Sequence, residues 1–221
     1  MGIFNGLWNG IKSIASAISS VLRESPLMQK LLPILSVAIP PPFDLIAVVA
    51  IMAISAAMGV EENPDELGWQ MSEADKKPED FGSFKEYKEY LDREYPFDQE
   101  KFDALSEEQK MACRYVGMAG TMAELKESNG FELTPESLGI IVKGAASLKW
   151  DDAQIGAFAK GLSVSLANSG AASLADIGAL AKGTLGPDKF GSVSDAISAG
   201  VKEAGVKQDN AAIIASLQEN V

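Results

Sequence analysis

Hydrophobic and polar residues are distributed unevenly along this chain, and the least polar stretch runs from residue 31 to residue 60. That stretch reads LLPILSVAIPPPFDLIAVVAIMAISAAMGV and carries a single charged residue, Asp44. Proline lacks a backbone N–H group and fixes φ, so three consecutive prolines end any helix that precedes them. We therefore expect two apolar arms joined by a bend at Pro40, Pro41, Pro42 and Asp44.

The second arm, residues 45–58, is apolar on every side except at Ser55. Asp44 is placed to cap its first turn, and Gly59 stands where a helix usually ends. A helix that is apolar all round is buried in a protein core or in lipid. Its fourteen residues reach about 21 Å, short of the roughly 30 Å hydrocarbon core of a bilayer. The arm is therefore interpreted as part of a re-entrant hairpin or of a buried core hairpin.

Residues 3–22 at the N-terminal end show the 3–4 spacing of apolar positions that is typical of an amphipathic helix. Asn and Ser residues occupy the opposite face, where Lys12 is the only charge. Such a helix, with Phe4 and Trp8 near its start, can lie in a bilayer interface, and it can equally pack on another subunit or on the arm at 45–58. No basic region precedes it, so we expect no cleavable signal peptide.

These two segments supply the residues that we expect to contact a membrane or the core of an oligomer. They are Ile3, Phe4, Leu7, Trp8, Ile11, Ile14, Ile18, Leu45, Ile46, Val49, Ile51 and Ile54. A strip of small residues on the second arm would also let another helix approach closely. That strip consists of Ala47, Ala50, Ala53 and Ala57.

Residues 61–82 break the apolar pattern with prolines, glycines and many carboxylates, which indicates a loop. We expect an acidic linker here, anchored to a neighbouring element by Trp69. Residues 83–103 then concentrate aromatic side chains on one helix face, with charged residues on the rest. This acidic-aromatic segment is interpreted as a short helix docked by its aromatic side chains. The alternative is a surface that binds a protein partner.

Helix-start signals recur downstream of this segment. Ser106 and Gln109 have the spacing of a capping box, which predicts a helix that runs to Ser128. Gly117 and Gly120 inside it indicate close packing against another helix.

The last part of the chain is quasi-repetitive. From Thr134 the units GIIVKGAASL, IGAFAKGLSVSL, IGALAKGTLG and ISAGVKEAG follow one another. Units of this length cannot bury an apolar face alone and must stack. We predict a compact array of five short helices in residues 134–221. The candidate helix starts are Asp151 or Asp152, Ser173 and Ser194, and the breaks contain Gly170, Gly186 and Gly205.

Together these patterns predict an all-α fold. Residues 1–60 form an amphipathic helix and an apolar hairpin, residues 61–82 an acidic linker, and residues 83–221 a compact multi-helix domain of short repeat-like helices from residue 134. Downstream of the linker, apolar residues keep to helical faces and charges recur every few residues. We therefore expect residues 83–221 to fold as a soluble domain without residues 1–60.

The distribution of charged residues along the chain limits the classes of molecule that it can bind. The net charge is −12, and residues 61–110 hold seventeen acidic residues against seven basic ones. Sequence-independent binding of nucleic acid needs clustered Lys and Arg, so we expect no nucleic-acid partner. Residues 1–60 carry three basic and two acidic residues, which makes them the part that anionic lipid would not repel.

The sequence lacks the residues that several kinds of catalysis and metal binding require. It contains no histidine and one cysteine, Cys113, which removes Ser–His and Cys–His nucleophiles, His-ligated zinc and the commonest general acid or base. The stretch from Gly178 to Thr184 resembles a phosphate-binding loop, but its lysine precedes the second glycine and no strand leads into it. We therefore expect no catalytic residue, cofactor or metal, and no enzyme activity.

The sequence favours a non-enzymatic, membrane-interacting protein, either a pore-forming or penetration component or a membrane anchor, of the kind found in a virion or a secreted particle. It would be membrane-associated or incorporated in a particle. The alternative is a structural or scaffold protein whose apolar N-terminal region is buried in a homo-oligomer, because a short apolar helix can form the centre of a multi-subunit bundle.

Overall fold

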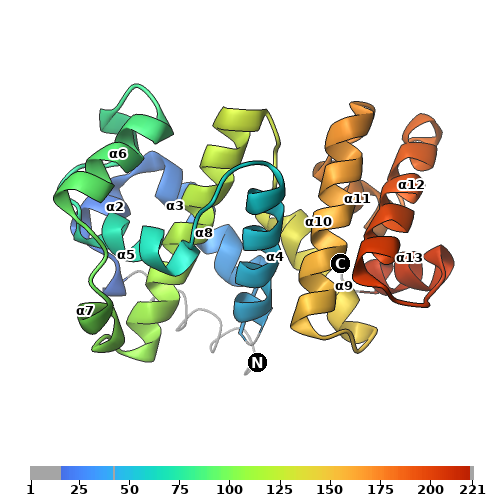
Figure 1. Cartoon of the computed structure of the whole chain (residues 1–221), viewed down its shortest axis with the longest axis horizontal. Coiled ribbons are helices and arrows are strands. Elements are labelled where there is room, and N and C mark those ends of the chain that lie inside the picture. Colours follow the sequence, from blue (N-terminus) through green and yellow to red (C-terminus); the bar gives the residue numbers. More distant parts are fainter. Residues whose placement is uncertain (1–15, 42, 220–221) are drawn as a thin grey trace. The chain divides into compact units, whose positions relative to one another are not determined.

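The computed structural model describes residues 16–41 and 43–219, and these form twelve α-helices and one short 3-10 helix without a β-strand (Figure 1). The prediction of an all-α fold is confirmed. Most of the predicted amphipathic helix at residues 3–22 lies outside the described residues, and so does Pro42 of the bend.

The chain divides into two compact units, and each combines segments that are distant in the sequence. Unit 1 comprises Met1–Val37 and Glu62–Glu127, and unit 2 comprises Ala38–Glu61 and Ser128–Val221. The two arms of the apolar hairpin therefore contribute to different units. This grouping does not follow the boundaries at residues 60 and 82 that the sequence pattern suggests. Independent folding of residues 83–221 remains a prediction.

Unit 1 is built from six α-helices and the 3-10 helix η1. They are α2 (Ser20–Glu24), α3 (Pro26–Ala38), α5 (Pro64–Glu73), η1 (Pro78–Asp80), α6 (Phe84–Glu94), α7 (Gln99–Asp103) and α8 (Glu107–Asn129). Its core consists of fully buried apolar and aromatic side chains. They include Leu22, Met28, Leu35, Leu67, Met71, Tyr87, Leu91 and Tyr115.

The segment predicted to be an acidic linker contains helix α5, so the prediction of a loop was wrong for residues 64–73. The side chain of Asn63 accepts a hydrogen bond from the Asp65 N–H at 3.0 Å, and Pro64 occupies the first helical position. Proline at that position begins a helix instead of breaking one, because its missing N–H would have had no partner there. Trp69 anchors the segment as expected, but it does so from a helix, against Phe97 at a ring distance of 5.6 Å.

Helices α5 and α8 are in backbone contact at two glycines. A Cβ atom on Gly68 would lie 1.7 Å from the carbonyl oxygen of Cys113, and one on Gly117 would lie 1.7 Å from the carbonyl oxygen of Pro64. Only glycine allows such an approach. The prediction that Gly117 marks a close helix contact is thus confirmed, and its partner is the helix inside the predicted linker.

Unit 2 is built from six α-helices. They are α4 (Phe43–Ala57), α9 (Pro135–Ser147), α10 (Asp152–Ser169), α11 (Leu174–Ala181), α12 (Pro187–Ala204) and α13 (Asn210–Gln218). Helix α10 packs against α4 and α12, and α9 packs against α11, α13 and α4. The five helices expected between residues 134 and 221 are thus present within residues 134–219, but they share their unit with α4.

Most of the predicted helix boundaries in unit 2 are confirmed by their caps. The Asp151 carboxylate accepts from the Gln154 N–H at 2.8 Å, and Gly170 ends α10 with φ of 60°. Ser194 is not a helix start, because α12 already begins at Pro187 and continues through it. A serine is chemically the same inside a helix as at its cap, so residue type alone did not separate the two.

Candidate functional site

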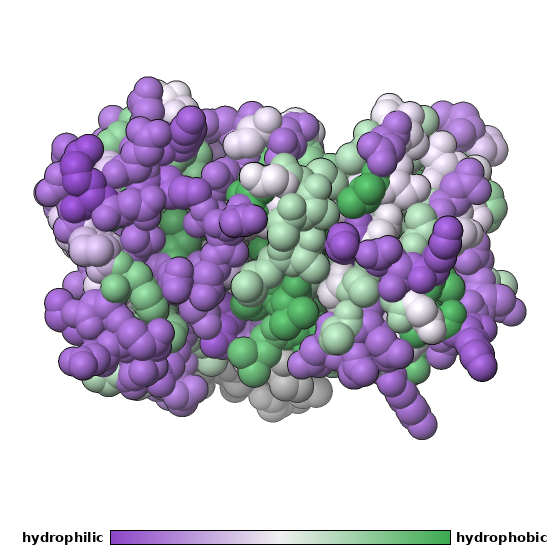
Figure 2. All heavy atoms as spheres, viewed as in Figure 1, coloured by the Kyte–Doolittle hydropathy of each residue, from purple (hydrophilic) through white to green (hydrophobic). Residues whose placement is uncertain are grey.

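Helix α4 buries one side in unit 2 and leaves another side open. Its buried residues are Asp44, Ala47, Val48, Ala50, Ile51, Ile54 and Ser55. The open side carries Leu45, Val49 and Met52, whose exposed fractions are 56%, 36% and 41%. Their spacing of four and three residues aligns them along the helix, and Figure 2 shows hydrophobic surface over α4. We call these three residues the apolar row.

The residues that we expected from the sequence to contact a membrane or an oligomer core differ in how far they are exposed. Leu45 and Val49 are exposed, whereas Ile51 and Ile54 have no exposed surface. Ile46 is half-buried, and Ile18 is buried in unit 1. The other six lie outside the described residues. They are Ile3, Phe4, Leu7, Trp8, Ile11 and Ile14.

Met52 belongs to the exposed side of α4, although the sequence did not single it out. It follows Val49 by three residues and Leu45 by seven, which is the spacing of one helix face. That spacing could have identified it. In a helix with almost no polar residue, however, every face has the same apolar signature.

Helix α10 meets α4 at a glycine beside the apolar row. A Cβ atom on Gly156 would lie 3.0 Å from Val49 Cγ1 and 3.8 Å from Ala53 Cβ. Ala47 and Ala50, from the strip of small residues, have no exposed surface. Small side chains on both helices therefore permit a close contact between α4 and α10 within unit 2.

The ends of α4 follow the signals in the sequence. The N–H of Phe43 donates to the carbonyl of Pro40 at 3.0 Å, which forms the turn into the helix. The helix begins at Phe43, two residues before the predicted arm, so Asp44 lies buried in its first turn and not in the bend. At the other end Gly59 has φ of 77°, and the N–H of Val60 donates to the carbonyl of Ser55 at 2.8 Å. Gly59 thus ends the helix as predicted, because a positive φ costs glycine little.

Helix α3, the first arm of the hairpin, is also only partly covered. Met28, Leu32 and Leu35 are buried, whereas Ile34 and Val37 are exposed by 41% and 50%. No single described helix is both long and apolar enough to cross a membrane. The pair Pro26–Ala38 and Phe43–Ala57 meets the length and hydropathy requirements when its two helices are taken together across the break.

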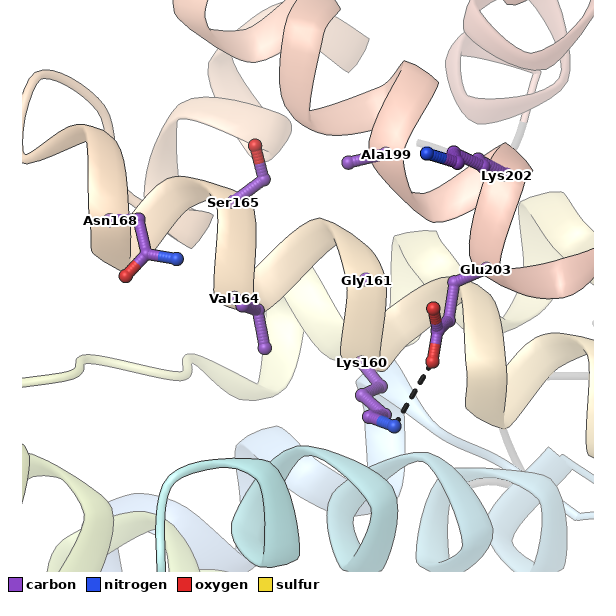
Figure 3. A pocket seen from close by; sticks show the side chains of 8 residues that line it. All are labelled: Lys160, Gly161, Val164, Ser165, Asn168, Ala199, Lys202 and Glu203. Atoms are coloured by element: carbon purple, nitrogen blue, oxygen red, sulfur yellow. Dashed lines mark ion pairs between the residues drawn. The ribbon is translucent and has the colours of Figure 1, made fainter.

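A pocket of about 430 Å³ lies between α10 and α12 in unit 2 (Figure 3). It is lined by Lys160, Gly161, Val164, Ser165, Asn168, Ala199, Lys202 and Glu203. The Lys160 ammonium pairs with the Glu203 carboxylate at 3.0 Å, and both side chains are nearly half exposed. No sequence motif marked this pocket, although Lys160 and Lys202 are equivalent lysines of the repeat-like units.

Glycines set the shape of this pocket. A Cβ atom on Gly161 would lie 2.9 Å from the carbonyl oxygen of Ala199, and one on Gly200 would lie 2.8 Å from the carbonyl oxygen of Phe158. The two helix backbones therefore touch at these residues. Polar side chains of α10 and α12 line the pocket beside this contact.

Unit 1 holds a partly buried charge cluster in which Lys88 pairs with Glu62 and lies 3.5 Å from Glu124. Burial raises the pKa of Glu62 above its usual value, although Lys88 opposes this shift. Burial also acts to lower the pKa of Lys88, but the hydrogen bonds and negative charges of Glu62 and Glu124 together outweigh it and raise that pKa. One oxygen of Glu124, Oε2, is buried without a hydrogen-bond partner.

The aromatic side chains of the acidic-aromatic segment face the interior of unit 1. Phe84, Tyr87, Tyr90 and Phe102 are all less than 9% exposed. Tyr90 donates a hydrogen bond to the Asp75 carboxylate, and burial raises the pKa of Tyr90 above its ordinary value. This packing is that of a docked helix. A protein partner for residues 83–103 remains a prediction.

Two other sequence features have structural explanations. Burial raises the pKa of the Cys113 thiol, which lies against the Ser72 hydroxyl at 3.7 Å in the core of unit 1. Gly183, in the stretch that resembles a phosphate-binding loop, has φ of 66° and follows the end of α11. Among the described residues, no group of three or more His, Cys, Asp or Glu side chains is arranged to hold a metal ion.

The apolar row of α4 and the pocket beside α10 are therefore the candidate sites in the described part of unit 2. Both are positioned by α10, through Gly156 on one side and Gly161 on the other. No protein-family model, curated protein or solved structure matches this chain.

Proposed function

We propose that this protein is a non-enzymatic membrane-binding protein that contacts lipid through the apolar row of α4. One observation carries the proposal: three large apolar side chains stand exposed in line on a helix whose other side is held in unit 2. Aligned apolar side chains of this kind mark a surface that meets another apolar phase, whereas single exposed apolar residues are ordinary.

The binding energy of the row is limited. Burying a Leu, Val or Met side chain completely contributes about 1.5–3 kcal/mol, and the side chains of the row are already partly covered. The row alone would give weak, reversible binding, and stable attachment to a membrane takes two signals. We infer that the amphipathic segment 3–22 supplies the second one, through the apolar residues that precede Ile18 in its sequence pattern, because Ile18 and Leu22 are buried in unit 1.

The packing of α4 within unit 2 favours contact at the membrane surface over deep insertion into the bilayer. Ile51 and Ile54 have no exposed surface, and Gly156 of α10 lies against Val49. Deep insertion of α4 would have to break these contacts, whereas contact through the exposed surface of Leu45 and Met52 leaves them in place. We therefore propose interfacial contact, with α4 lying along the membrane surface. A penetrating or pore-forming role would require α4 to separate from α10.

Flotation of the full chain with phosphatidylcholine vesicles tests the proposal. The wild-type chain should float with the vesicles, and the double variant Leu45→Gln/Met52→Gln should bind at least about tenfold more weakly, because two apolar contacts are lost. Phe190→Gln is the matched control, since Phe190 is 49% exposed on α12 and lies outside the row.

Two results would contradict the proposal. The first is a wild-type chain that stays in the soluble fraction. The second is a double variant that floats as well as the wild type. Sedimentation without detergent addresses the alternative. A monodisperse oligomer that the double variant dissociates would show that the row packs on a second copy of the chain, as in a scaffold protein.

A further inference from the structure

The apolar row and the pocket share one edge of α10. Gly156 contacts Val49 and Ala53 of α4, and Lys160 follows Gly156 by four residues on α10. Residues four apart lie on the same face of a helix. The Lys160 side chain therefore projects from the side of α10 that meets α4, and Figure 3 shows it pointing toward the α4 ribbon.

The pocket presents more positive than negative charge. Two ammonium groups, Lys160 and Lys202, line it with a single carboxylate, Glu203. The Ser165 hydroxyl and the Asn168 amide line the same space and can also donate hydrogen bonds. This local excess of positive charge contrasts with the chain as a whole, whose net charge is −12.

We propose that this pocket binds the phosphate of an anionic lipid headgroup while the acyl chains of that lipid lie along the apolar row. The inference rests on the membrane-binding function proposed above and names the lipid class that the surface prefers. A volume of about 430 Å³ falls within the range of ordinary small-molecule sites.

The chemistry of the side chains fits a phosphate diester. A lysine ammonium has three donors, so Lys160 can hold Glu203 at 3.0 Å with one of them and a phosphate oxygen with another. Lys202 adds a second charge, and lysine binds phosphate as a point charge. Glu203 opposes the binding of an anion, so that the two lysines and this carboxylate leave the lining with a net charge of +1.

The acidic remainder of the chain does not cancel this attraction at physiological salt. Charges separated by more than about 8 Å are largely screened at about 0.15 M salt. The charges that act most strongly on a phosphate in the pocket are therefore those that line it, namely Lys160, Lys202 and Glu203. Each lysine near an anionic membrane surface contributes about 1 kcal/mol, which corresponds to roughly a fivefold change in affinity.

The experiment compares flotation of the full chain on neutral phosphatidylcholine vesicles and on vesicles that also contain phosphatidylglycerol, at about 0.15 M salt. The measured quantity is the ratio of binding to the two vesicle types. We expect the wild-type chain to prefer the anionic vesicles, and each of Lys160→Gln and Lys202→Gln to reduce this preference about fivefold. Lys182→Gln, an exposed lysine outside the pocket, should leave it unchanged.

The outcomes separate this inference from the membrane function. Equal binding to both vesicle types, or a preference that survives the Lys160→Gln/Lys202→Gln double variant, would overturn the headgroup site while membrane binding stands. A chain that binds neither vesicle type overturns the membrane function itself. Calorimetric titration with glycerol phosphate adds a soluble probe. If it binds and the vesicles show no anionic preference, the pocket serves a soluble phosphate ester and the lipid assignment is wrong.

Discussion

Gly156 of α10 and Val49 of α4 are in direct contact, so that a Cβ atom at position 156 would lie 3.0 Å from Val49 Cγ1. This contact holds the apolar hairpin's second arm inside unit 2 and turns Leu45 and Met52 outward. The glycine therefore allows α10 to approach α4 closely at Val49, in the middle of the apolar row.

Replacing this glycine should loosen unit 2. We expect Gly156→Val to lower the free energy of unfolding by about 1–3 kcal/mol, because the added methyl groups overpack the contact with α4. Chemical denaturation followed by circular dichroism measures the change. Gly191→Ala is the control, since nothing lies within 4 Å of a Cβ at that α12 position. The Gly191→Ala variant should have a free energy of unfolding about 0.5–1 kcal/mol higher than that of the wild type. Equal stability of the wild type and Gly156→Val would show that α4 does not pack here.

The apolar row should matter for binding and not for folding. Because Leu45 and Met52 are 56% and 41% exposed, we expect Leu45→Gln/Met52→Gln to change the free energy of unfolding by less than about 1 kcal/mol. Ile51→Ala, on the same helix but fully buried, should cost about 2–5 kcal/mol. Thermal melts of the three proteins provide the comparison. A large loss in the double variant would place the row in the core.

The structure changes what we expect from a truncated chain. Helix α4 packs against α9 and α10, and α5 contacts α8 at Gly68 and Gly117. A fragment of residues 83–221 lacks both α4 and α5, so we now expect it to expose apolar surface and to aggregate or melt without cooperativity. Circular dichroism with thermal unfolding, beside the full chain, measures this. A cooperative helical melt of the fragment would support the division expected from the sequence.

The charge cluster of unit 1 predicts a pH dependence. Because burial raises the pKa of Glu62 above 4.5, the folded state binds this proton more tightly than the unfolded state. The stability contributed by this group is fully present below pH 4.5 and is lost as the pH rises through the folded pKa. We therefore expect Glu62→Gln, which stays neutral, to flatten the stability profile across that window and to be at least as stable as the wild type at neutral pH.

Asp176 in unit 2 is a control for that experiment, because its pKa is shifted in the opposite direction to that of Glu62. Burial would raise the pKa of Asp176, but the hydrogen bonds from Lys189 and Ser173 and the charge of Lys189 together outweigh it and hold the pKa below 3.8. Its contribution is present above pH 3.8 and is lost as the pH falls through the folded pKa. Asp176→Asn should therefore be less stable than the wild type above pH 3.8, and this difference should disappear in the acid limb of the profile. Parallel profiles of wild type and Glu62→Gln above pH 4.5 would contradict the role given to Glu62.

Lys149 is strained in a way that glycine would relieve. It has φ of 62° at the end of α9, and no other non-glycine residue among those described has a positive φ. We expect Lys149→Gly to raise the free energy of unfolding by about 0.5–1 kcal/mol, since left-handed backbone costs other residues more than glycine. Lys143→Gly, in the interior of α9, should instead lower the free energy of unfolding by about 1 kcal/mol. Denaturant midpoints distinguish the two, and a loss in both would contradict the strain at Lys149.

The sequence by itself determined the all-α class and most helix ends. The cap of α8 joins Ser106 and Gln109, and that of α10 joins Asp151 and Gln154. Each is a contact between residues three apart, so the local pattern contains all the information needed. Gly59 and Gly170 ended their helices for the same local reason, because a positive φ suits glycine.

Only the tertiary structure decided which surfaces are covered. Helix α4 is apolar on nearly every side, so no local polarity distinguishes Leu45, which is exposed, from Ile51, which is buried. That choice depends on α10, whose Gly156 lies far along the chain. The packing of α5 also depends on a distant segment. Its acidic residues suggested a loop, whereas in the structure Gly68 packs against α8. Burial depends on contacts between distant segments, and their pairing is not encoded in the polarity of either segment alone.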